Sequence, residues 1–91
     1  MDRVGHFMPA ALATLLRKAP LTDAKVAFAW RSAVGATFDR VTAVTFKDGV
    51  LHVRARDAAW QREVERAAGL VRHRLDAILG AGVVKSIDVV S

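Results

Sequence analysis

The spacing of apolar residues changes near residue 41, and this change most constrains how the chain can fold. Residues 41–46 are β-branched or apolar, which is typical of a buried strand. In residues 50–56 apolar and polar side chains alternate, which predicts a strand with one covered and one outer side. The Asp48-Gly49 pair between the two runs supplies the positive φ angles of a tight hairpin. The outer side of the second strand carries His52, Arg54 and Arg56.

Around this hairpin, apolar residues recur every three or four positions, which predicts helices. Thr22 and Asp57 precede two of these runs and have side chains suited to N-caps, and Pro20 ends the first run. Gly35 interrupts the second run, and we expect it to permit close packing of a continuous helix. The three helices are predicted over residues 9–19, 22–39 and 58–80, followed by a last strand over residues 83–90.

The order α-α-β-β-α-β predicts one α+β domain over residues 1–91. The long third helix carries the chain back, so the last strand should run parallel to the second strand. We expect the last strand to pair beside the first, because the first is the most apolar strand. The prediction is a three-stranded antiparallel sheet of order 2-1-3, with helices on one face and the Arg-bearing strand at an edge.

Several classes of function find no support in the sequence. The chain has no Cys, which excludes disulfides and thiol nucleophiles, and its three His residues stand at no metal-ligand spacing. It contains no nucleophile elbow, no Walker motif and no GxGxxG loop. We therefore expect no enzyme activity, metal, cofactor or small-molecule substrate. No apolar stretch is long enough to span a membrane, and we expect a cytoplasmic protein.

The charge balance points to a polyanionic partner. The chain has 14 Lys and Arg against 9 Asp and Glu, a net charge of +5, and most of the basic residues are Arg. We expect the nucleic-acid contacts to share one side of the molecule. The alternative is that Glu63, Glu65 and Asp76 neutralise the helix charges locally, since Glu63–Arg66 and Arg72–Asp76 have ion-pair spacing. The candidate nucleic-acid-binding residues are Lys47, His52, Arg54, Arg56, Arg62, Arg66 and Arg72.

The two tryptophans are predicted to be core anchors rather than base-stacking platforms. Trp30 and Trp60 lie on the apolar stripes of their helices. The outer side of the second strand has no aromatic residue, which argues against a sheet that stacks bases.

Several short motifs together resemble the DciA family over roughly residues 10–90. They occur in the family's order and at about its spacing, and the segments that carry them are 30–35, 47–53, 59–64 and 75–80 with 83–87. The first three read W-x-x-x-V-G, D-G-x-L-x-V and A-W-x-x-E-V. The sequence departs from the family between Gly35 and Asp48, where Val41 to Val44 stand in place of an expected His and Pro.

The resemblance implies a KH-like domain that acts in bacterial DNA replication. It implies a protein without its own ATPase activity that binds DNA, single-stranded or duplex, and assists loading or operation of the hexameric DnaB-type replicative helicase. It further implies an association with the nucleoid. The chain has no GxxG loop, so the phosphate clamp of true KH domains does not carry over.

The sequence leaves two other functions open. One is a protein-interaction or homodimerisation module that uses an edge strand, the long helix, or the apolar residues Phe7, Met8 and Leu12. The other is a KH-like RNA-binding protein that recognises 2′-hydroxyl groups.

Overall fold

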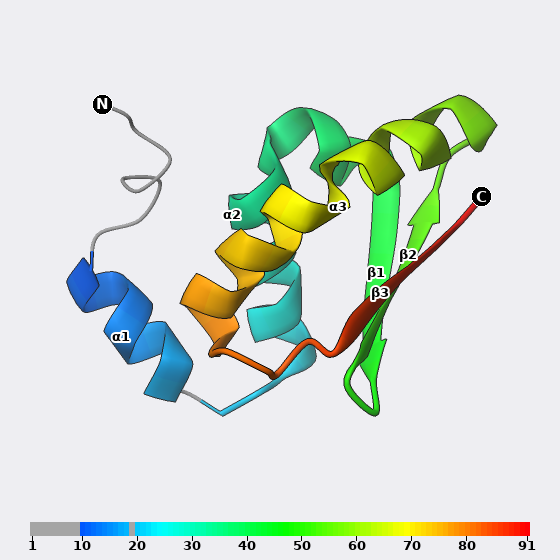
Figure 1. Cartoon of the computed structure of the whole chain (residues 1–91). Helices are drawn as coiled ribbons and strands as arrows, with labels where there is room; N and C mark the ends of the chain where they lie inside the picture. The colour runs from blue at the N-terminus through cyan, green and yellow to red at the C-terminus, as the bar shows by residue number, and fades with distance from the viewer. Residues whose placement is uncertain (1–9, 19) are drawn as a thin grey trace.

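The computed structural model describes residues 10–18 and 20–91, and within them the element order is the predicted one. Phe7, Met8, Pro9 and Ala19 lie outside the described residues. None of the described helices is long and apolar enough to cross a membrane. The elements are α1 (Ala10–Lys18), α2 (Asp23–Arg40), β1 (Thr42–Lys47), β2 (Val50–Ala55), α3 (Ala58–Leu79) and β3 (Ser86–Val90) (Figure 1).

The sheet has the order β1-β2-β3, so the predicted order 2-1-3 is wrong. β1 and β2 pair antiparallel through the hairpin, whereas β2 and β3 pair parallel, so the sheet is mixed rather than fully antiparallel. The parallel direction of β3 and β2 is confirmed. The Arg-bearing strand β2 is therefore the central strand and not an edge.

The reason for the central place of β2 lies in what it buries. Its inward residues Leu51, Val53 and Ala55 are fully buried, whereas the inward residues of β1 are only half-buried. The chain leaves β2, crosses the sheet as α3 and returns as β3, which pairs directly beside β2 in a β-α-β unit. The central strand is therefore indicated by the sharp alternation of buried and exposed residues in β2, and not by the overall apolar content of β1.

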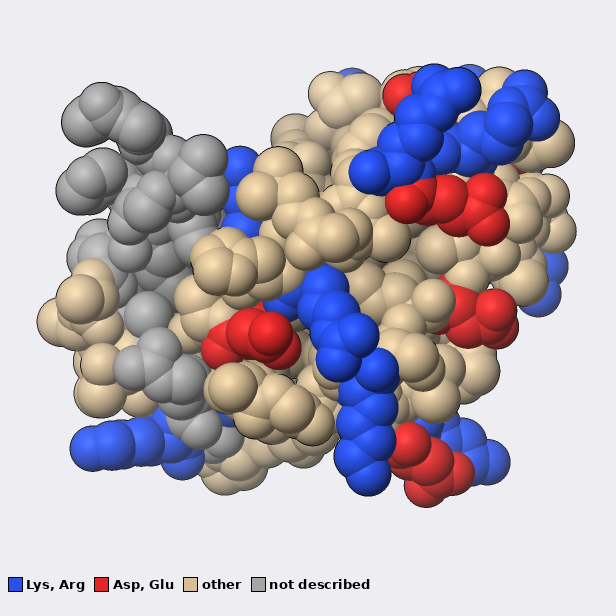
Figure 2. All heavy atoms as spheres, viewed as in Figure 1, with Lys and Arg blue, Asp and Glu red and all other residues tan. Residues whose placement is uncertain are grey.

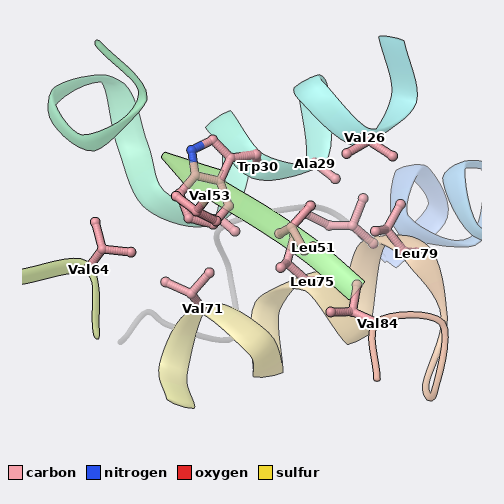
Figure 3. Close-up of a cluster of buried hydrophobic side chains, with 12 residues drawn as sticks. Val26, Ala29, Trp30, Leu51, Val53, Val64, Val71, Leu75, Leu79 and Val84 are labelled. Carbon is pink, nitrogen blue, oxygen red and sulfur yellow. The ribbon is translucent and has the colours of Figure 1, made fainter. Parts of the chain in front are cut away.

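The helices and the sheet form two layers. α2 and α3 cover one face of the sheet, α1 packs against α3, and no described element covers the other face (Figure 1). The core lies between the layers and centres on Trp30, Leu51 and Leu75, each about 1% exposed (Figure 3). Burial of these large side chains supplies the main favourable free energy of folding.

α2 is kinked at Gly35, so the prediction of a continuous, closely packed helix is wrong. Gly35 has φ 86° and ψ 168°, a backbone region that is essentially restricted to glycine. Gly35 is exposed, and an added Cβ would meet no atom within 4 Å. The glycine is needed for the backbone conformation of the kink and not for packing. Residues 36–40 form a short second segment after it.

Three hydrogen bonds hold α2 in place on either side of the kink. Nη1 of Arg74 on α3 donates to the carbonyl oxygen of Ala33 at 2.9 Å, just before the kink. Nε1 of Trp30 donates to Oγ1 of Thr42 at 2.9 Å, and that hydroxyl donates to the carbonyl of Phe38 at 2.7 Å. The broken helix is thereby tied to α3 on one side and to β1 on the other.

Other local predictions are confirmed. Thr22 caps α2 by accepting from the backbone N–H of Lys25, and Asp57 caps α3 by accepting from that of Trp60. Asp48 and Gly49 have φ angles of 53° and 81°, as a tight hairpin turn requires.

The tryptophans differ in their burial. Trp30 is a core anchor as predicted. Trp60 is half-buried and is not part of the core cluster, so the prediction that it is a core anchor is wrong. It packs edge-on against Phe38 instead, with ring centroids 5.6 Å apart. This contact joins the segment after the kink to the start of α3.

Candidate nucleic-acid interface

The two-layer architecture separates the predicted binding residues into two surfaces. His52 and Arg54 are exposed between buried neighbours on β2, so they project from the sheet face that no described helix covers. Arg62 and Arg66 are exposed on α3, which covers the opposite face of the sheet. The expectation that all the predicted residues share one side of the molecule is therefore wrong.

On the helix side, the positive charge is partly neutralised. Arg66 Nη1 lies 2.7 Å from Glu63 Oε2, which confirms that predicted ion pair, whereas Arg72 and Asp76 form no ion pair with each other. Arg72 lines a hollow of about 350 Å³ between α3 and β3, together with Gly69 and Ser86. Figure 2 shows acidic and basic side chains next to each other over the start of α3, at the upper right. This surface is mixed in charge.

The opposite surface is the exposed side of the sheet, here called the open sheet face. The strand register aligns Thr45, His52 and Asp88 in one row across the three strands. His52 Nδ1 lies 3.5 Å from Asp88 Oδ2, and this row borders a hollow of about 320 Å³. The exposed residues of this face are Ala43, Thr45, Lys47, His52, Arg54, Ser86, Asp88 and Val90.

Three arginines meet at one end of the open sheet face, and we call them the arginine corner. Arg40, Arg54 and Arg56 are exposed and line a hollow of about 360 Å³. None of the three forms an ion pair with any residue of the described chain. The hollow shares Ala43 and Arg54 with the one beside His52, so the two hollows adjoin.

Local structure explains how the arginine corner forms. Arg54 is the exposed residue opposite Ala43 in the β1–β2 register. The backbone N–H of Arg56 donates to the carbonyl of Val41 at 2.8 Å, which extends the pairing beyond the end of the strands. Arg40 is the last residue of α2 and immediately precedes Val41. The kinked end of α2 and the end of β2 therefore place their arginines around the same hollow.

Arg40 was not among the residues predicted from the sequence, although a usable signal exists. The hairpin pairs Lys47 with Val50, and counting back along both strands places Val41 opposite Arg56. Arg40 then follows as a neighbour of Arg56. From the sequence, Arg40 is equally explained as a basic side chain at a helix C-terminus, where the helix dipole favours a positive charge.

Lys47 lies at the other end of β1 from the arginine corner. It is exposed beside the hairpin turn, five strand positions from Thr42 or roughly 17 Å along the strand. It is thus outside the arginine corner. The distance between them spans several phosphates of an extended nucleic-acid strand.

The chemistry of the open sheet face suits phosphate rather than bases. Guanidinium groups are planar and donate paired hydrogen bonds that match phosphate oxygens. The exposed residues of this face include no aromatic side chain on which a base would stack. Among the described residues, no group of His, Asp and Glu side chains is arranged to hold a metal ion.

Comparison with known proteins agrees with the resemblance seen in the sequence. The family model described as "Dna[CI] antecedent, DciA" matches residues 3–89. The chain belongs to the DciA family. This family is linked to loading of the DnaB helicase in replication, and its members are accessory proteins rather than known enzymes. Neither the curated proteins nor the solved structures contain a match to the chain.

Proposed function

We propose that this protein is a DNA-binding accessory of the DnaB-type replicative helicase that holds DNA through the arginine corner. The observation that carries this proposal is the meeting of Arg40, Arg54 and Arg56 around one hollow without a carboxylate partner in the described chain. The DciA family membership supplies the replication context. Such a protein acts in the cytoplasm at the nucleoid, and the helices on one face of a three-stranded sheet support a KH-like domain.

The electrostatics favour binding to a polyanion. Three like charges around one hollow repel one another, and a bound phosphate relieves this repulsion. Contacts to phosphates carry no base code, so we expect affinity without sequence preference. Each phosphate contact releases counterions. The logarithm of the DNA affinity therefore falls by about 0.7 to 0.9 units per contact for each tenfold rise in salt concentration.

The other predicted residues have graded roles in this proposal. His52 faces Asp88, whose carboxylate offsets a positive charge there. Arg66 is paired with Glu63, and both lie on the helix side with Arg62. We propose Arg40, Arg54 and Arg56 as the first contacts, Lys47 and His52 as peripheral contacts on the same face, and Arg62, Arg66 and Arg72 as a separate surface.

A pair of charge-matched double variants tests the proposal. Arg54→Glu with Arg56→Glu alters the arginine corner, whereas Arg62→Glu with Arg72→Glu makes the same charge change on the helix side. Fluorescence anisotropy with labelled single-stranded DNA, duplex DNA and RNA is measured over a salt series. We expect the first variant to lose most of its DNA affinity and the second to keep most of it. Equal losses in the two variants, or unchanged binding by the first, would exclude the arginine corner as the DNA site.

A second candidate function, protein interaction without a direct DNA role, is favoured by apolar side chains exposed on the helices. Leu15, Phe28 and Leu70 are 67%, 45% and 48% exposed. Phe7 and Met8 lie outside the described residues, and the side chain of Leu12 is not described either. Tight binding to purified replicative helicase together with weak, salt-insensitive DNA binding would favour this function. A clear preference for RNA over DNA of equal length would favour the KH-like RNA-binding function.

A further inference from the structure

The hollow between α3 and β3 lies apart from the proposed DNA contacts. It has a volume of about 350 Å³ and is lined by Ala68, Gly69, Arg72, Ser86 and Ile87. The side chain of Arg72 is exposed and forms no hydrogen bond or ion pair with another described residue. The described residues that line the hollow include no carboxylate. The hollow therefore contains a positive charge that has no partner in the described chain.

β3 adds hydrogen-bond donors to this hollow. The carbonyl oxygen of Val89 accepts from Nε2 of Gln61 at 3.1 Å, so the backbone of residue 89 is directed away from β2. Every second residue of a strand has the same backbone direction, so Ile87 also directs its N–H and C=O groups away from β2. Outside the sheet, no described backbone group bonds to Ile87. The N–H of Ile87 and the hydroxyl of Ser86 are thus unpaired donors at the edge of the hollow.

Gly69 leaves the hollow open on the α3 side. A Cβ atom added at this residue would meet no atom within 4 Å, so the helix presents free space there. The neighbouring Ala68 is small, and Ile87 forms an apolar wall on the β3 side. The hollow therefore has room for the side chain of a ligand, with apolar surface around it and Arg72 within it.

A second cation lies next to the hollow along the chain. Lys85 directly precedes Ser86 and is exposed. Its aliphatic stem packs over the hairpin turn, because a Cβ atom added at Gly49 would lie 2.9 Å from Cδ of Lys85. Figure 2 shows a band of basic side chains down the middle of this view, where α3 and β3 lie side by side. The positive charge at Arg72 is thus reinforced along the edge of β3.

We propose that this hollow binds the carboxylate of an acidic residue in an extended segment of a partner protein. The guanidinium of Arg72 can donate paired hydrogen bonds to a carboxylate, and the unpaired N–H of Ile87 can donate a further charge-assisted bond. The apolar wall of the hollow suits the rest of such a segment. The inference does not rest on the proposed DNA function, because none of the lining residues belongs to the arginine corner.

The charges around the hollow favour a single carboxylate over a nucleic acid. Glu65 and Asp76 lie on the same side of α3 as Arg72, two turns before it and one turn after it. A nucleic acid would bring several phosphates close to these two carboxylates, which repel them. One acidic side chain can instead meet Arg72 alone. The surface therefore matches a protein segment with a local negative charge.

A titration followed by nuclear magnetic resonance tests this site. The isotope-labelled full chain is titrated with a short capped peptide that has one aspartate between two valines, and separately with the same peptide carrying asparagine. We expect the amide signal of Ile87 and the Nε–H signal of Arg72 to shift and saturate with the aspartate peptide. The dissociation constant should lie in the millimolar range, because one exposed ion pair contributes little. The asparagine peptide should bind about fivefold more weakly or not at all.

Three variants give the test its controls. Arg72→Gln removes the charge in the hollow and should weaken binding of the aspartate peptide about fivefold or more. Arg62→Gln makes the same charge change on the same helix outside the hollow, and should leave binding unchanged. Gly69→Leu fills the hollow while raising helix propensity, and should abolish the shifts with either peptide. The amide spectrum of each variant without peptide shows whether the fold is kept.

Several results would overturn the proposal. Equal binding of the two peptides, or no shift at Ile87 in the wild-type chain, would show that the hollow recognises no carboxylate. Equal losses in Arg62→Gln and Arg72→Gln would make the effect one of net charge. Shifts confined to Arg54 and Arg56 would place the peptide at the arginine corner. Tighter binding of inorganic phosphate than of the aspartate peptide would make the hollow a phosphate site instead.

Discussion

Trp30 and Thr42 are joined by a hydrogen bond of 2.9 Å from the indole Nε1 to the threonine Oγ1. The bond links a fully buried core side chain to the first residue of β1. The same hydroxyl donates to the carbonyl of Phe38, in the segment after the kink of α2. Because Arg40 follows two residues later, the placement of a candidate DNA contact depends on a core tryptophan.

The first prediction concerns the threonine hydroxyl. Thr42→Val keeps the shape of the side chain but leaves the buried indole N–H of Trp30 without its acceptor. An unsatisfied buried donor costs about 1–3 kcal/mol of stability. The midpoint of thermal unfolding should therefore fall by at least about 4 °C. Thr42→Ser keeps the hydroxyl and should lose less, and equal stability of the two variants would show that the bond contributes little.

The second prediction separates two exposed glycines. Gly35→Ala should destabilise the protein by about 1–3 kcal/mol, because the backbone there has a conformation that alanine avoids. Gly69→Ala in α3 should instead stabilise it by roughly 0.5–1 kcal/mol through higher helix propensity. An added Cβ meets no atom within 4 Å at either position, so packing does not explain the difference. Urea unfolding of both variants measures it, and shifts of the same sign would contradict the assignment of the kink.

Local features of the fold could be predicted because they depend on neighbours in the chain. The caps at Thr22 and Asp57 and the turn at Asp48-Gly49 each follow from residues within a few positions. The alternation of β2 likewise separated buried from exposed side chains correctly. The kink at Gly35 was missed because a helical pattern of apolar residues continues through it, and a glycine has no side chain to mark the break.

The sheet order and the composition of the site depend on contacts between distant residues. Apolar content suggested β1 as the central strand, but the strand that α3 covers and that β3 joins is β2. Once β2 is central with α3 on its inner face, Arg54 and Arg62 must lie on opposite sides of the molecule. The number of charges along the chain does not show on which side of the molecule each residue lies. The basic residues that we predicted on one surface therefore lie on two surfaces in the structure.

The third prediction concerns Arg40, which the structure adds to the candidate DNA contacts. Arg40→Ala should reduce the dependence of DNA affinity on salt by about 0.7 to 0.9 log units per log unit of salt, the value for one phosphate contact. Arg62→Ala removes an exposed arginine from the helix side and should leave the slope unchanged. Anisotropy titrations at several salt concentrations give both slopes. A reduced slope for Arg62→Ala and an unchanged one for Arg40→Ala would move the DNA site to the helix layer.

The fourth prediction concerns the carboxylate on the open sheet face. Asp88 lies 3.5 Å from His52 and is the acidic residue among the exposed side chains of this face. Removing its negative charge near a bound phosphate is worth a few tenths to about 1 kcal/mol in water, so Asp88→Asn should tighten DNA binding about threefold at low salt. The gain should shrink as salt screens the interaction. Glu65→Gln removes the same charge from α3 and should leave affinity unchanged. An equal gain from Glu65→Gln would mean that net charge, and not the open sheet face, governs binding.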